Sequence, residues 1–144
     1  MATHVLLVED NAGDVRLTQE AFREVNPSIQ LHIANDGVEA MSFLRRQGAN
    51  LDAPRPDFIL LDLNLPKMDG REVLAQIKAD ASLKMTPTLI LTTSKEGRDI
   101  ARSYELQANC YLCKPVQLDE FEKLVKSLND FWLTKAELPQ LTGD

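Results

Sequence analysis

The chain has 144 residues, with 16 basic and 22 acidic side chains and a formal net charge of −6 at pH 7. That length suits one domain, and 44% hydrophobic with 26% charged residues is the composition of a globular protein. The acidic balance argues against nucleic acid as a partner. No apolar run approaches the roughly 20 residues of a membrane-spanning helix, and no signal peptide is recognisable, so we expect a cytoplasmic protein without a membrane partner.

Short apolar runs alternate five times with amphipathic stretches, which predicts five strands that are each followed by a helix. The expected strands cover residues 5–8, 29–34, 58–63, 88–92 and 110–113. Four of these runs are apolar on both faces, as in a parallel sheet that is covered on both sides. The second run alternates between apolar and polar residues, so we expect it at an edge of the sheet.

Helices are expected over residues 14–25, 38–47, 71–80, 98–105 and 118–133, where apolar residues recur at helical spacing. The stretch 98–105 has the smallest apolar face, formed by Ile100 and Ala101. Helix-length connections imply parallel strands with right-handed crossovers. The pattern therefore predicts an α/β protein with a doubly wound parallel sheet, in which chemistry collects at the carboxyl ends of the strands.

Polar side chains lie at the ends of four expected strands. Glu9 and Asp10 follow the first strand, Thr92 ends the fourth, Lys114 follows the fifth, and Asp62 interrupts the apolar third strand. A buried carboxylate needs a partner, and carboxylates about 5 Å apart repel by about 3 kcal/mol per pair at an effective dielectric of about 20. We therefore expect Lys114 and a divalent cation with oxygen ligands, such as Mg²⁺, to compensate the acids.

This combination of groups suits phosphoryl chemistry. A carboxylate beside a cation, a lysine and a threonine hydroxyl can attack phosphorus and hold an acyl phosphate, while the positive groups stabilise the phosphoryl oxygens. The combination is more specific than any one of its parts, and it predicts a site in which a carboxylate accepts a phosphoryl group.

Four segments resemble the receiver domain of two-component response regulators: VLLVED at 5–10, ILLDLNLPKMDG at 59–70, LTTS at 91–94 and YLCKP at 111–115. The resemblance implies a flavodoxin-like fold with a five-stranded parallel sheet of order 2-1-3-4-5 and helices on both faces. It also implies a single receiver domain over 1–144, with a core of about 3–133 and an extension, 134–144, that is too short for an output domain.

The resemblance assigns the acidic residues to phosphoryl and metal binding. Asp62 corresponds to the phosphoacceptor, and Glu9 and Asp10 to the acidic pair that binds Mg²⁺ or Mn²⁺ together with it. Asn64 would contribute its backbone carbonyl to the metal. Receivers often carry two aspartates where this chain has a Glu-Asp pair, and both variants supply two carboxylates.

The resemblance assigns four further residues. Lys114 corresponds to the lysine that contacts the phosphoryl group, and Thr92 to the hydroxyl that turns toward it. Tyr111 corresponds to the aromatic residue that changes rotamer with phosphorylation. In the family the bond between the lysine and the following proline is cis, which implies a cis bond between Lys114 and Pro115.

Segments outside the active site, at 55–66, 103–106 and 131–133, resemble the small stand-alone response regulators of cyanobacterial phytochromes. This implies a light-sensing histidine kinase as phosphodonor. Because 134–144 is too short for an output domain, we expect output by docking to another protein, by onward phosphotransfer or by self-association. Phe131, Trp132 and Leu133 are more apolar than a free tail should be. We expect a homodimer through this end, while a tail folded back on its own domain remains an alternative.

Two other functions remain open. A metal-dependent aspartyl-phosphate phosphatase typically carries a second acid two residues after its nucleophile, where this chain has Asn64. A constitutive pseudo-receiver would be expected to lack the acceptor, the acidic pair or the lysine, whereas this chain retains all of them. We therefore expect a phosphoacceptor signalling protein rather than a turnover enzyme.

Overall fold

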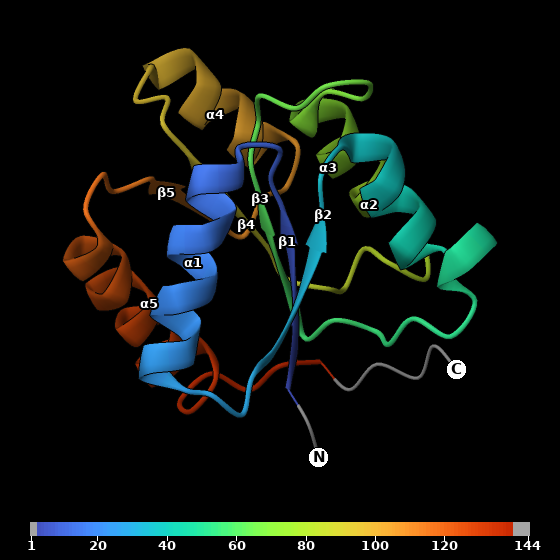
Figure 1. The fold of residues 1–144 in the computed structure, drawn as a ribbon. Helices are drawn as coiled ribbons and strands as arrows, with labels where there is room; N and C mark the ends of the chain where they lie inside the picture. Colours follow the sequence, from blue (N-terminus) through green and yellow to red (C-terminus); the bar gives the residue numbers. More distant parts are fainter. Residues whose placement is uncertain (1–2, 140–144) are drawn as a thin grey trace.

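The computed structural model describes residues 3–139 (Figure 1). Strands and helices alternate in the predicted order, and each boundary lies within three residues of its prediction. A short 3₁₀ helix between the second α-helix and the third strand was not predicted. The elements are β1 (His4–Val8), α1 (Ala12–Val25), β2 (Gln30–Ala34), α2 (Gly37–Leu44), η1 (Gly48–Asn50), β3 (Phe58–Leu61), α3 (Gly70–Ala79), β4 (Thr88–Thr92), α4 (Gly97–Glu105), β5 (Cys110–Cys113) and α5 (Leu118–Trp132).

The five strands form one parallel sheet of order β2-β1-β3-β4-β5, which confirms the predicted flavodoxin-like topology. The alternating strand β2 lies at one edge, as its sequence predicts. Strand β5 forms the other edge, and its residues are half-exposed or exposed although its apolar sequence suggested cover on both faces. Position at the edge explains the difference, because the covering helices lie over the centre of the sheet.

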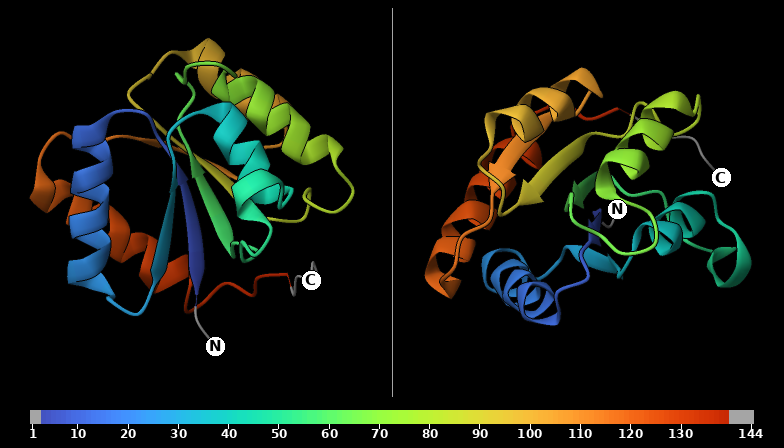
Figure 2. Two further views of the ribbon diagram at one scale, coloured as in Figure 1. Left: turned by 45° about the vertical axis from the view of Figure 1, so that its right-hand side comes forward. Right: turned by 90° about the horizontal axis from the view of Figure 1, so that it is seen from above.

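Helices cover both faces of the sheet (Figure 2). Helices α1 and α5 pack on one face, and α2, α3 and α4 lie over the other. Successive residues of β1 alternate between the two cores: Val5 and Leu7 face α1 and α5, whereas Leu6 and Val8 face α2 and α3. Each fully buried aliphatic side chain of this kind stabilises the fold by about 1.5–3 kcal/mol.

Three turns at the carboxyl edge of the sheet begin helices with side-chain caps, at Asn11, Asp36 and Asp69. The side chain of Asn11 accepts a hydrogen bond from the backbone N–H of Asp14 and caps α1. The side chain of Asp69 caps α3 through Arg71 N–H. A Cβ at Gly70 would collide with the carbonyl oxygen of Asp62 and approach the Cα of Leu63 to 2.6 Å. Only glycine therefore allows α3 to start so close to the end of β3.

The chain after α5 turns back across the end of the molecule where the strands begin (Figures 1 and 2). Trp132 and Leu133 pack against the core beneath α1 and α5, and Leu138 and Pro139 are half-buried. These contacts favour the alternative that the tail folds back on its own domain, whereas Phe131 remains 55% exposed. Residues 140–144 of the expected extension lie outside the described residues. No helix within residues 3–139 is long and apolar enough to cross a membrane.

Candidate functional site

The polar residues that end the strands come together at one edge of the sheet. Parallel pairing places Val8 beside Leu61, so the next residues, Glu9 and Asp62, are neighbours. The backbone N–H of Asp62 donates to Val8 O, and that of Glu9 donates to Ala34 O. These bonds continue the sheet beyond the strands and hold both acidic residues in register. The predicted convergence of the strand ends is therefore confirmed.

Three carboxylates form an acidic cluster at this edge. Oxygens of Glu9, Asp10 and Asp62 all lie within 4.8 Å of one another, with Glu9 and Asp62 buried and Asp10 exposed. Hard oxygen ligands that meet on one side suit Mg²⁺ or Mn²⁺, because such ions keep several water ligands on the other side. The donor set therefore fits a divalent cation.

Asn64 lies next to the cluster, where its backbone N–H donates to Asp62 Oδ1 at 3.3 Å. This contact fixes one oxygen of the Asp62 carboxylate. The use of the Asn64 carbonyl as a metal ligand stays a prediction.

Lys114 enters the same cluster from β5. Its Nζ lies 2.5 Å from Glu9 Oε1, 2.9 Å from Asp14 Oδ2 and 2.9 Å from Asp62 Oδ2. The lysine side chain is only 5% exposed, and burial by itself would lower its pKa. The hydrogen bonds to the three carboxylates outweigh burial and raise the pKa of Lys114, so the ammonium stays charged.

Glu9 is the acid whose protonation is most altered. Burial, together with the charge of Asp62, raises the pKa of Glu9 from 4.5 to about 7, although the hydrogen bond from Lys114 opposes this shift. One lysine therefore does not fully compensate the buried acids. A divalent cation at the cluster would favour the ionised form of Glu9.

The bond between Lys114 and Pro115 is trans, since residues 3–139 contain no cis peptide bond. The expectation of a cis bond at this position is corrected. A trans bond before proline is favoured by about 0.5–1 kcal/mol. With this trans backbone the Lys114 side chain reaches the carboxylates of Glu9, Asp14 and Asp62. The backbone N–H of Lys114 donates to Thr92 O.

Thr92 ends β4, which lies beside the acceptor's strand β3, and Tyr111 lies on the next strand, β5. Within residues 3–139, Thr92 Oγ1 is the one buried side-chain oxygen or nitrogen that lacks a hydrogen-bond partner. A hydroxyl without a partner is available to donate to an incoming group. The Tyr111 hydroxyl donates to the Ser94 carbonyl at 2.9 Å, which ties β5 to the loop after β4.

That loop is held by a second set of contacts. Ser94 Oγ donates to Asp99 at 2.6 Å, and Arg71, from the first turn of α3, donates to the same carboxylate at 2.7 Å. The loop that follows Thr92 is therefore linked to α3, α4 and β5. A movement of Thr92 can reach all three elements through these bonds.

Asp14 is the residue that sequence reasoning missed. The predicted helix began at residue 14, whereas α1 begins at Ala12 after the cap Asn11. Asp14 therefore lies in the first turn, within reach of the strand ends, and its carboxylate contacts Lys114. An acid three residues after a capping asparagine was the available signal.

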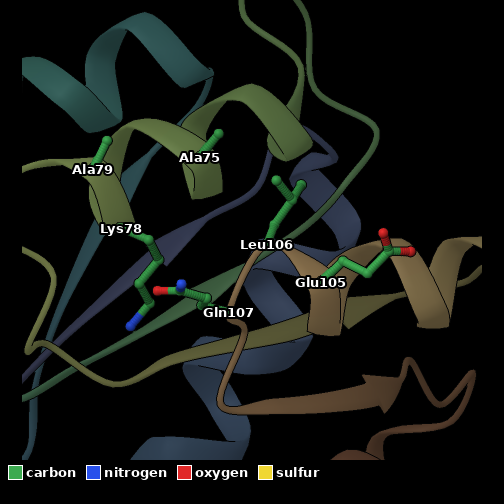
Figure 3. A pocket seen from close by; sticks show the side chains of 6 residues that line it. All are labelled: Ala75, Lys78, Ala79, Glu105, Leu106 and Gln107. Carbon is green, nitrogen blue, oxygen red and sulfur yellow. The ribbon is translucent and has the colours of Figure 1, made fainter.

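A cavity of about 280 Å³ between α3 and α4 lies away from this cluster (Figure 3). Its lysine, Lys78, donates to the carbonyls of Lys84 and Thr86 and to Asn109 Oδ1. Neutral oxygens thus satisfy this amine, which fastens the end of α3 to the segments that precede β4 and β5. The residues around the cavity are Ala75, Lys78, Ala79, Glu105, Leu106 and Gln107.

Comparison with known proteins agrees with this geometry. The family model of the response regulator receiver domain matches residues 5–126. The chain is 49% identical over 135 residues to response regulator Rcp1 of Synechocystis sp., which covers 94% of this chain and 92% of Rcp1.

Two solved structures are similar to the whole fold. The phosphorylated cyanobacterial phytochrome response regulator RcpA matches with a TM-score of 0.92 and 47% identity, over 97% of this chain and 100% of that one. The Mn²⁺-bound form of Rcp1 matches with a TM-score of 0.88 and 48% identity, over 96% and 99% of the two chains. An acidic cluster of this kind is typical of receiver domains, which bind a divalent cation there. The chain belongs to the response regulator receiver domain family.

Proposed function

We propose that this protein is a single-domain response regulator that accepts a phosphoryl group from a histidine kinase on Asp62. The environment of the Asp62 carboxylate carries this proposal. One oxygen accepts from Lys114 at 2.9 Å and the other from Asn64 N–H at 3.3 Å, inside the acidic cluster. A buried carboxylate held at both oxygens beside a cation site is oriented for attack on phosphorus.

In the proposed step, an Asp62 oxygen forms a bond to phosphorus while the bond from phosphorus to the kinase histidine nitrogen breaks. The electron pair stays on that nitrogen, and an imidazole protonated on its other nitrogen leaves neutral. Lys114 holds one phosphoryl oxygen, and Thr92 Oγ1 gains its missing partner by donating to another. Glu9, Asp10 and Asp62 would hold a divalent cation, which would supply positive charge to the phosphoryl oxygens when bound.

The output follows from the contacts of the β4–α4 loop. A Thr92 that turns toward the phosphoryl group moves this loop, to which Tyr111 is bonded through Ser94. The phosphoryl group thereby favours a second arrangement of the face formed by α4, β5 and α5. A downstream protein, or a phosphotransfer partner, would bind to that face in its altered arrangement.

We further propose a phytochrome-type kinase as the donor, because RcpA, to which this chain is 47% identical, is a cyanobacterial phytochrome response regulator. The test is phosphotransfer from a phosphorylated phytochrome-type histidine kinase and, in parallel, from a histidine kinase of another sensor class. Transfer that is much faster from the phytochrome-type kinase supports the pairing. Equal rates from both kinases would leave the receiver function intact but contradict the pairing.

Intact-protein mass after incubation with Mg²⁺ and acetyl phosphate tests the acceptor function. The wild type and Asp119→Asn, which alters an acid on α5, should each gain one phosphoryl group, while Asp62→Asn gains none. Continuous consumption of the donor, far beyond one equivalent, would instead favour the phosphatase alternative. No gain in any protein would favour a constitutive binding module.

We also propose that two copies associate through the exposed end of α5. Phe131 is 55% exposed and lies edge-to-face against Trp132, with ring centroids 5.8 Å apart. An exposed aromatic that is held rigid by its neighbour is a typical contact residue.

A further inference from the structure

Lys114 has no donor left for a further partner in this structure. An ammonium carries three N–H donors, and three carboxylates, those of Glu9, Asp14 and Asp62, lie within 2.9 Å of Nζ. A phosphoryl group carries a charge of about −1.5 to −2 and three acceptor oxygens. While the phosphodonor approaches and Asp62 is still a carboxylate, Lys114 must release one of its three carboxylates to bind a phosphoryl oxygen.

Asp14 is the partner that is easiest to release. Its side chain is 26% exposed, whereas the side chains of Glu9 and Asp62 are 3% and 7% exposed. A partly exposed carboxylate can exchange its bond to Lys114 for water at a lower cost than a buried one. The two buried carboxylates would instead lose their partner without gaining water.

The backbone around Asp14 does not need to move for this exchange. Its N–H donates to the Asn11 side chain at 2.9 Å, and its carbonyl accepts from Thr18 Oγ1 at 2.7 Å. Both contacts hold the first turn of α1 while the side chain stays free to rotate. The exchange therefore requires a rotamer change only.

We propose that Asp14 is a positioning residue that occupies Lys114 in the resting state and is displaced when Asp62 is phosphorylated. This inference rests on the proposed function of Asp62. Asp14 holds the ammonium between the acids, and it competes with the phosphoryl oxygens for the same donor. Its charge also repels the incoming phosphodonor. Asp14 thereby slows phosphorylation.

The test compares Asp14→Asn with the wild type in phosphorylation by acetyl phosphate at saturating Mg²⁺. Asparagine keeps the shape of the side chain but removes the charge that strengthens the hydrogen bond, so phosphorylation should accelerate about fivefold. Asp14→Ala removes the acceptor and should accelerate it as well. Asp14→Glu keeps the charge and should restore a rate close to that of the wild type.

Glu20→Gln is the matched control, because Glu20 lies on the same helix and pairs with Arg16 rather than with Lys114. It removes the same charge and should change the rate less than twofold. A residue with a merely structural role would slow phosphorylation when altered, so an equal or lower rate in Asp14→Asn and Asp14→Ala overturns the inference. If the wild type itself gains no phosphoryl group, the proposed function fails instead.

Discussion

Lys114 Nζ lies 2.9 Å from Asp62 Oδ2, although 52 residues separate them in the sequence and β4 lies between their strands in the sheet. The long side chain spans the end of β4 from the edge strand to the centre. This contact exists only because three parallel strands end at the same edge. The charge of the buried acids is therefore compensated only when the sheet is correctly formed.

Removal of Lys114 should therefore destabilise the protein as well as disable the site. Lys114→Ala leaves Glu9 and Asp62 buried without their cation, and loss of one partner from a buried pair costs about 3–5 kcal/mol. Urea unfolding in EDTA measures this loss. Mg²⁺ should restore part of it, since a ligand of the folded state shifts the equilibrium toward that state.

Lys126→Ala is the control for this experiment. Lys126 pairs with Asp130 on the exposed side of α5, where solvent screens the interaction. We expect little or no change in the free energy of unfolding. An equally small change for Lys114→Ala would show that the buried acids do not depend on the lysine.

Affinity for the divalent cation should rise with pH around neutrality. Burial raises the pKa of Glu9 to about 7 without metal, so below that pH the folded protein holds a proton that the cation must displace. The apparent Kd for Mg²⁺ should fall between about pH 6 and 8 and then level off. Titration calorimetry at several pH values measures both the Kd and the released proton.

The raised pKa of Glu9 also makes the stability of the metal-free protein depend on pH. Between 4.5 and about 7 the folded state binds more protons at Glu9 than the unfolded state, so this group makes the metal-free protein less stable as the pH rises. Glu9→Gln removes both dependences. Retention of either one in that variant would assign the titration to another group.

Gly70→Ala should be strongly destabilising. A Cβ at this position collides with the carbonyl of Asp62 and the backbone of Leu63, and backbone atoms cannot move aside as a side-chain end can. Overpacking of this kind costs about 1–3 kcal/mol. It should also slow phosphorylation by acetyl phosphate, because the displaced backbone is that of Asp62.

Gly97→Ala provides the matched control, since nothing lies within 4 Å of the Cβ that it would add at the start of α4. Alanine favours helix over glycine by up to about 1 kcal/mol, so this variant should be neutral or slightly more stable. If the two variants lose equal stability, the close approach at Gly70 is not what requires glycine.

The association of two copies can be separated from stability at the end of α5. Phe131→Ser removes an exposed ring and should weaken self-association in sedimentation while leaving thermal unfolding nearly unchanged. Trp132→Ala removes a ring that packs on its own core and should lower the melting temperature. A wild type that sediments as a monomer at all concentrations would contradict the proposed association.

The sequence predicted the sheet and most of the site because their signals are local. Asp62 interrupts an otherwise apolar strand, and Thr92 and Lys114 lie where two further runs end. In a parallel sheet all strand ends share one edge, so their meeting follows from topology. The helix boundaries were less accurate, because a cap such as Asn11 precedes the first apolar residue.

Contacts between side chains of different elements were beyond such reasoning. The bond of Asp14 to Lys114 depends on how the first turn of α1 is oriented over the sheet. His4 and His32 are 28 residues apart and look dispersed in the sequence, yet their ring nitrogens lie 2.9 Å apart across β1 and β2. The cis bond expected before Pro115 came from resemblance alone, and the structure has it trans.

The central claim, that Asp62 carries the phosphoryl group, is tested most directly by its chemical location. Reduction of the phosphorylated protein with borohydride converts an aspartyl phosphate to homoserine, which peptide mass spectrometry can place. We predict homoserine at position 62 alone, and none in Asp62→Asn or in protein treated without a phosphodonor. Homoserine at Asp10 or another acid, with Asp62 unmodified, would contradict the account.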